Sequence, residues 1–216
     1  MTTLMLLRHG RTSANSEGIL AGDSPVGLDE VGEAQARAAG ARLAGVRLDA
    51  VVSSPLQRCR QTLAIAMPGA TFNVENGLTE CGYGEWAGRK LSDLANEPLW
   101  STIQHHPAAV TFPGGEAMSA MSARAVAAVR RWNDHVGSAG IWLACTHGDI
   151  IKAIVADALS MHLDQFQRIH VAPGSITVIR YTPERPFLLR LSDDNAPLAL
   201  GATSTSSDAP VGGGAV

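Results

Sequence analysis

Two histidines in this chain each follow an apolar segment and precede a glycine. His9, within Arg8-His9-Gly10, follows residues 4–7, and His147, within Thr146-His147-Gly148, follows residues 141–145. Each apolar segment has the length of a buried strand, and parallel strands of an α/β protein bring their carboxyl ends to one edge of the sheet, where ligands bind. We therefore expect His9 and His147 to share one site, where the glycines let a ligand approach the backbone closely.

The residues around His9 are suited to phosphoryl chemistry. A neutral imidazole, whose unperturbed pKa is about 6.5, is a nucleophile at physiological pH. Arg8 places a permanent positive charge beside it. Arg58 follows Ser54-Pro55, the expected start of a helix whose N-terminal N–H groups favour anions. The planar arginine fork matches phosphate oxygens, and His147 can complete a cationic pocket.

Such a reaction also needs an acid to protonate the leaving group. Glu80 and Glu85 are the candidates, because both lie in a loop whose apolar and aromatic neighbours can raise the pKa of a carboxyl group. The residues of this loop alone leave the choice between them open.

Strand and helix patterns alternate along the chain and predict the α/β class, with a mostly parallel sheet and helices on both faces. The expected strands are residues 4–7, 49–52, 71–74 and 141–145, followed by a β-ribbon of residues 175–181 and 187–191. The expected helices are residues 31–45 capped by Asp29, 55–67 started by Ser54 and Pro55, 116–136, and 149–159. We expect helix 116–136 to serve core packing only, and residues 78–115 to hold a lid or a segment that contacts substrate.

The composition fits one domain and a tail. A chain of 216 residues, 45% hydrophobic and 17% charged, is long enough for one well-buried α/β domain, which we place at residues 1–200. Residues 201–216 are rich in Gly, Ser, Thr and Ala, and we expect them to be disordered. The net charge of -3 argues against a nucleic-acid partner, because such a partner is usually held by a basic field.

Other sequence features bear on location and on metals. The three cysteines have no paired or metal-ligand spacing and suit a reducing compartment. The chain passes directly into a core strand without a charged leader, and no apolar stretch has the length of a membrane span. We therefore expect a cytoplasmic protein with no membrane partner. His105, His106 and His162 lack the spacing of a metal-binding helix, so we expect neither a metal nor a cofactor.

Five motifs occur in a specific order along the chain. They are Arg8-His9-Gly10, then Ser53-Ser54-Pro55 with Arg58 and Thr62, then Leu78-Thr79-Glu80 leading into Gly84-Glu85-Trp86-Ala87-Gly88, then Pro113-Gly114-Gly115-Glu116, and finally Thr146-His147-Gly148. This order resembles the histidine phosphatase superfamily, also called phosphoglycerate-mutase-like, over about residues 4–181. The resemblance implies a three-layer α/β/α fold and a phosphohistidine intermediate.

The resemblance also implies roles for individual residues. It makes His9 the nucleophile and Glu80, ahead of Glu85, the general acid and base. The implied phosphate pocket consists of Arg8, Arg58, His147, Asn15, which lies six positions after His9, and Thr12. Arg11 departs from the acidic residue or glutamine that commonly follows the glycine, and its role stays open.

Within the superfamily the choice is between a phosphatase and a mutase. Glycolytic mutases have a longer insertion with a basic Glu-Arg-Arg stretch after the acid/base glutamate, whereas this chain offers Arg89-Lys90 and then mostly neutral residues through Phe112. We therefore predict phosphomonoester hydrolysis of a small phosphorylated metabolite, with phosphotransfer of the mutase type as the alternative.

A non-catalytic phospholigand-binding module is the alternative from another class. Such a module would need the arginines, but it would need neither the nucleophile nor the acid. The intact set of His9, Glu80 and His147 therefore favours an enzyme. The sequence does not decide between a monomer and a homodimer.

Overall fold

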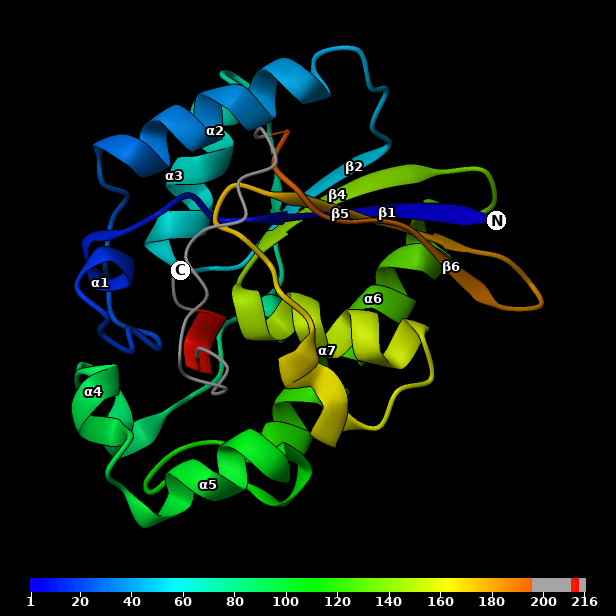
Figure 1. The fold of residues 1–216 in the computed structure, drawn as a ribbon. Helices are drawn as coiled ribbons and strands as arrows, with labels where there is room; N and C mark the ends of the chain where they lie inside the picture. Colours follow the sequence, from blue (N-terminus) through cyan, green and yellow to red (C-terminus); the bar gives the residue numbers. More distant parts are fainter. Residues whose placement is uncertain (196–210, 214–216) are drawn as a thin grey trace.

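The computed structural model describes residues 1–195 and 211–213 and contains, in that part of the chain, a central sheet of six strands with helices on both faces (Figure 1). The strand order is β3-β2-β4-β1-β5-β6. The strands are β1 (Thr2–Arg8), β2 (Ala50–Ser53), β3 (Asn73–Val74), β4 (Ile141–Thr146), β5 (Ile176–Tyr181) and β6 (Pro186–Asp193).

The sheet is mostly parallel, as predicted. Strands β3, β2, β4 and β1 run parallel to one another, while β5 pairs antiparallel with β1 and β6 antiparallel with β5. In the central pair, Leu7 of β1 lies opposite Cys145 of β4, and Arg8 lies opposite Thr146. The next residues, His9 and His147, therefore leave the sheet side by side.

Two helical layers cover the sheet (Figure 1). On one face, α2 (Glu30–Leu43) and α3 (Gln57–Ala66) bury a cluster that includes Leu7 and Leu63. On the other face, α6 (Met118–Val136) and α7 (Gly148–Ala158) bury a larger cluster that includes Leu6 and Ile151. Because successive side chains of a strand point to opposite faces, Leu6 and Leu7 of β1 each belong to a different layer of the core. The predicted three-layer α/β/α fold is confirmed.

The predicted N-cap is found at the start of α2 but not at the start of α3. Asp29 caps α2 as expected, since its Oδ1 accepts the Gly32 N–H at 2.8 Å. The expected serine cap of the next helix is wrong: α3 begins at Gln57, after Leu56, without a side-chain cap. The physical reason is that the buried hydroxyl of Ser54 lies 2.8 Å from His147 Nε2 and is engaged there.

Residues 78–115 form a packed segment with helices of its own, which we did not predict. It contains α4 (Leu91–Leu94), α5 (Pro98–His105) and the short 3₁₀ segments η2 (Gly84–Trp86) and η3 (Pro107–Ala109). Trp86 joins these elements, because its ring centroid lies 6.5 Å from that of Trp100 and 5.6 Å from that of Phe112. The remaining short helices are α1 (Ser13–Ser16), η1 (Asn76–Leu78), η4 (Leu163–Arg168) and η5 (Val211–Gly213).

The predicted disordered tail, residues 201–216, lies largely outside the described residues. Only Val211–Gly213 of it are described, and these form the short 3₁₀ segment η5. Val211 is buried at 2% exposure, and the Gly212 N–H donates to Asp149 Oδ2 at 3.1 Å. Burial of the Val211 side chain and the hydrogen bond of the Gly212 N–H both stabilise this short turn.

Two further observations concern the chain as a whole. All three cysteines are buried free thiols. Along residues 1–195 and 211–213, none of the helices combines the length and the apolar character that crossing a bilayer requires.

Candidate active site

The structure brings His9 and His147 together with Arg58 at the carboxyl edge of the sheet. The two imidazole centroids lie 5.2 Å apart. Arg58, near the start of α3, donates its Nε–H to both rings, to His9 Nε2 and to His147 Nδ1, each at 3.2 Å. All three side chains are at most 3% exposed. The two histidines therefore lie next to each other, as the sequence predicted.

His9 is held in one tautomer. Its Nδ1 lies 2.8 Å from the carbonyl oxygen of Gly10. Because a carbonyl oxygen can only accept, Nδ1 must carry the proton, and the neutral ring keeps a lone pair on Nε2. Burial, followed by the charges of Arg58 and Arg8, lowers the pKa of His9 well below its ordinary value. His9 therefore offers an unprotonated Nε2 at neutral pH.

His147 takes the opposite tautomer. Its Nδ1 accepts from Arg58, so the ring proton lies on Nε2, from which it donates to Ser54 Oγ at 2.8 Å. Burial, followed by the charge of Arg58, lowers the pKa of this ring as well. His147 is also the N-cap of α7, so the free N–H groups of that helix open at the site.

The two arginines bring positive charge into the interior. Arg8 is fully buried, and its Nη1 donates to the Val171 carbonyl at 2.6 Å; Arg58 Nη2 donates to the Gly22 carbonyl at 2.7 Å. These acceptors are neutral, so they orient the guanidinium groups without cancelling their charge. Burial lowers the pKa of Arg8 to about 10, which leaves it charged at neutral pH.

Glu80 faces the same site from the loop after η1. It is 4% exposed, and its Oε1 accepts the Cys81 N–H at 3.0 Å. Burial, followed by repulsion from Asp149, raises the pKa of Glu80 to about 7, although Arg58 and Arg8 act in the opposite direction. Glu85, the other candidate, is exposed. A carboxyl group that holds its proton near neutral pH is therefore available at Glu80.

A narrow pocket lies over His9. Its wall includes four of the residues singled out in the sequence, Thr12, Asn15, Arg58 and Glu80, together with Val211 and Gly212, whereas Arg8 and His147 lie behind it. Thr12 Oγ1 donates to Asn15 Oδ1 at 2.9 Å, and the Thr12 N–H reaches the same oxygen at 3.1 Å. This fixes the amide of Asn15 so that its carbonyl end is occupied and its Nδ2 end is the donor left for a ligand.

The sequence profile of the histidine phosphatase superfamily (branch 1) matches residues 4–194. The chain belongs to this superfamily. A bifunctional protein of Mycobacterium tuberculosis is 32% identical over 197 residues, which are 88% of this chain and 53% of that protein, so the chain spans about half the length of that relative. An acid phosphatase of Mycobacterium tuberculosis is 29% identical over 204 residues, covering 92% of this chain and 97% of the relative.

The solved structure of Bacillus stearothermophilus YhfR is similar to this histidine phosphatase fold with a TM-score of 0.82 and 26% identity, over 89% of this chain and 98% of that one.

This member of the histidine phosphatase superfamily has a buried polar network that sequence reasoning missed. Asp149 is fully buried in the first turn of α7, where its carboxylate accepts from Tyr83 OH at 2.9 Å and lies 3.3 Å from Lys152 Nζ. The signal that could have revealed it is a pair of opposite charges three residues apart in a helix that is otherwise apolar.

Arg11 and Arg89, two other charged residues named from the sequence, are paired outside the pocket. Arg11 Nε lies 2.8 Å from Asp29 Oδ2, so its charge supports the cap of α2 rather than the phosphate pocket. Arg89 pairs with Glu97 at 2.6 Å.

The histidines outside the pocket are exposed. His106 and His162 are 72% and 71% exposed beside Asp164. Within residues 1–195 and 211–213, no group of three or more His, Cys, Asp or Glu side chains is placed to hold a metal ion.

Proposed function

We propose that this chain hydrolyses small phosphomonoesters through a phosphohistidine at His9. The observation that carries the proposal is that His9, whose Nε2 keeps its lone pair, shares one pocket with Arg58 and with the buried carboxyl group of Glu80. Membership of the histidine phosphatase superfamily supports the same reaction.

In the first step His9 Nε2 attacks phosphorus. The N–P bond forms, the bond to the leaving oxygen breaks, and that oxygen takes the proton of Glu80. In the second step the Glu80 carboxylate takes a proton from water, whose oxygen forms a bond to phosphorus as the N–P bond breaks. Inorganic phosphate leaves, and both residues return to their starting protonation states.

Arg58 changes its hydrogen bond when substrate binds. In the free site its Nε–H points at the lone pair of His9 Nε2. A phosphate oxygen is a stronger, charged acceptor than an imidazole nitrogen, so it draws this N–H away and exposes the lone pair. Arg8, His147 and the Nδ2 of Asn15 complete the set that we assign to the phosphoryl oxygens, with Thr12 orienting Asn15.

Hydrolysis is favoured over mutase chemistry by the position of Arg89. A mutase must hold the carboxylate of its sugar-acid substrate with spare cations, whereas Arg89 is already paired with Glu97 and Lys90 is exposed outside the wall of the pocket over His9. The substrates we assign are therefore small metabolites whose only required anionic group is the phosphate. A cytoplasmic location, the absence of a nucleic-acid partner, and a homodimer stay predictions.

A rapid alkaline quench with ³²P-labelled substrate tests the proposal. Wild-type protein is expected to yield an acid-labile, base-stable phosphoenzyme, and His9→Ala to yield neither phosphoenzyme nor turnover. His162→Ala, at an exposed histidine, is the matched control and should behave as wild type. Equal activity of the wild type and His9→Ala would refute the covalent mechanism.

A further inference from the structure

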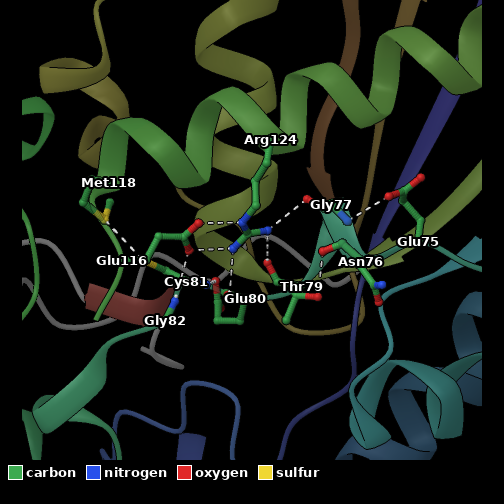
Figure 2. A network of polar contacts seen from close by, with 10 residues as sticks. All are labelled: Glu75, Asn76, Gly77, Thr79, Glu80, Cys81, Gly82, Glu116, Met118 and Arg124. Atoms are coloured by element: carbon green, nitrogen blue, oxygen red, sulfur yellow. Dashed lines mark hydrogen bonds and ion pairs between the residues drawn. The ribbon is translucent and has the colours of Figure 1, made fainter. Parts of the chain in front are cut away.

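Arg124, a residue of α6, reaches across to the loop that carries Glu80 (Figure 2). Its Nη1 donates to the carbonyl oxygens of Gly77 at 2.9 Å and of Thr79 at 2.7 Å, and its Nη2 donates to the carbonyl oxygen of Glu80 at 3.0 Å. One guanidinium group thus gathers three backbone carbonyls of the segment that leads up to Glu80 and includes it.

Glu116 fixes that guanidinium group from the other side (Figure 2). Its carboxylate accepts from Arg124 Nε at 2.7 Å and from Arg124 Nη2 at 2.8 Å. The same carboxylate accepts the Gly82 N–H at 3.2 Å, and the Glu116 N–H donates to the Gly82 carbonyl at 2.7 Å. The backbone is therefore held before Glu80 by Arg124 and after it by Glu116.

The Glu80 side chain itself has little to hold it. Among the described residues its carboxylate accepts one hydrogen bond, from the N–H of the adjacent Cys81. The position of the Glu80 carboxyl group in the pocket therefore depends on the position of the Glu80 backbone. Arg124 and Glu116 line a neighbouring surface hollow together with Glu80, not the pocket over His9. Their hydrogen bonds go to the backbone of the Glu80 loop and to each other, so we assign their effect on the site to the loop.

The ion pair has the charge state that this task needs. Burial alone would raise the pKa of Glu116, but the hydrogen bonds and charge of Arg124 outweigh it and lower that pKa. The five donated hydrogen bonds of Arg124 match the five N–H donors of a guanidinium group in number, which a lysine ammonium cannot reproduce.

We infer that Arg124 and Glu116 are positioning residues that clamp the Glu80 loop and hold the carboxyl group over His9. The inference rests on the proposed function, because it assigns these two residues to the acid/base step of that reaction. It also gives a use to the Pro113-Gly114-Gly115-Glu116 motif, whose glutamate lies just before α6.

The test compares leaving groups in Arg124→Lys and Glu116→Gln. A misplaced acid penalises an alkyl phosphate, which needs a proton on its leaving oxygen, more than p-nitrophenyl phosphate, which does not. We expect kcat for the alkyl phosphate to fall on the order of 10–100-fold, the cost of about 1 Å of misplacement. The single-turnover phosphorylation rate with p-nitrophenyl phosphate should fall much less. Inhibition by inorganic phosphate should be unchanged, because the phosphate pocket is intact.

A double-mutant cycle with Glu80→Gln separates positioning from general damage. If Arg124 acts through Glu80, Arg124→Lys has no further effect on the alkyl phosphate once Glu80 is glutamine. Arg130→Lys, in the same helix at 71% exposure, is the matched control and should be silent.

Equal losses with both substrates, additive losses in the cycle, or loss of phosphate inhibition would each overturn the inference, and Glu116→Gln answers the question if Arg124→Lys does not fold. Failure of the proposed function is distinguishable, because the wild type would then yield no phosphoenzyme in the alkaline quench.

Discussion

Glu80 links acid catalysis to folding stability at the level of one residue. A buried carboxyl group with a raised pKa binds its proton more tightly in the folded chain than in the unfolded chain. Its contribution to stability is therefore fully present below its ordinary pKa of 4.5 and is lost as pH rises through about 7. The residue that we assign to proton transfer is thus a source of instability in its ionised form.

We expect Glu80→Gln to stabilise the protein at alkaline pH. Glutamine keeps an oxygen that can accept the Cys81 N–H but never ionises. The gain over wild type should grow between pH 4.5 and 7 to on the order of 3 kcal/mol at pH 8, from a shift of this size at 1.36 kcal/mol per unit. Urea unfolding of both proteins at pH 5 and pH 8 measures it. The low pKa values of His9 and His147 also make stability depend on pH, but equally in both proteins.

A difference in unfolding free energy that is the same at both pH values would contradict the raised pKa. Glu85→Gln, at the exposed carboxyl group of the same loop, is the matched control and should change stability little at either pH.

At the scale of elements, strand ends could be predicted from the sequence and helix-borne polar groups could not. An apolar run followed by Arg-His-Gly identifies the end of β1 without reference to the rest of the chain. Arg124 and Asp149 become part of the site only through the way α6 and α7 pack on the sheet. Helix 116–136 was expected to serve packing only, yet its Arg124 also hydrogen-bonds the Glu80 loop. An amphipathic pattern identifies the buried face of a helix but not the partners of its other side chains.

The connection between β2 and α3 shows the same limit. Ser54 has the sequence context of a helix cap, yet its hydroxyl lies against His147 Nε2. Local sequence cannot separate the two uses, because the competing partner comes from another strand of the sheet.

We expect Ser54→Ala to act on catalysis through the tautomer of His147. Without the hydroxyl, the buried Nε2–H of His147 is left with the weak acceptor Cys59 Sγ at 3.5 Å, and the ring is freer to turn away from Arg58. Removal of this hydrogen bond should destabilise the protein by about 1–3 kcal/mol and lower kcat/KM by about tenfold. Steady-state kinetics and urea unfolding measure the two effects. Unchanged kcat/KM would mean that other contacts hold the ring.

At the scale of the whole molecule, the far end of the chain closes the pocket. Val211 and Gly212 line it, and the Gly212 N–H donates to Asp149, whose charge raises the pKa of Glu80. The chain segment that composition marks as a tail thus contacts residues from the loop of Tyr83 and from α7.

Deletion of residues 211–216 should therefore alter substrate selection. Removing the Val211 side chain widens the pocket, so kcat/KM for a bulky aryl phosphate should rise relative to that for a small alkyl phosphate. A series of phosphomonoesters of increasing size measures the change. Deletion of residues 214–216 alone, which leaves Val211–Gly213 in place, is the control. Identical size dependence in the wild type and both deletions would show that Val211 does not limit the pocket.

The place of β1 in the sheet has a consequence for biosynthesis. Of the six strands, β1 is synthesised first, yet it lies between β4 and β5 in the sheet. Leu7 of β1 therefore has no partner strand until Cys145 of β4 and Ile176 of β5 have been synthesised. Contacts this distant in sequence form late and slowly. During translation, His9 therefore leaves the ribosome long before Arg8, Arg58 and His147 can surround it. A nascent chain shorter than about Tyr181 therefore carries the nucleophile before β5 can complete the pairing of β1.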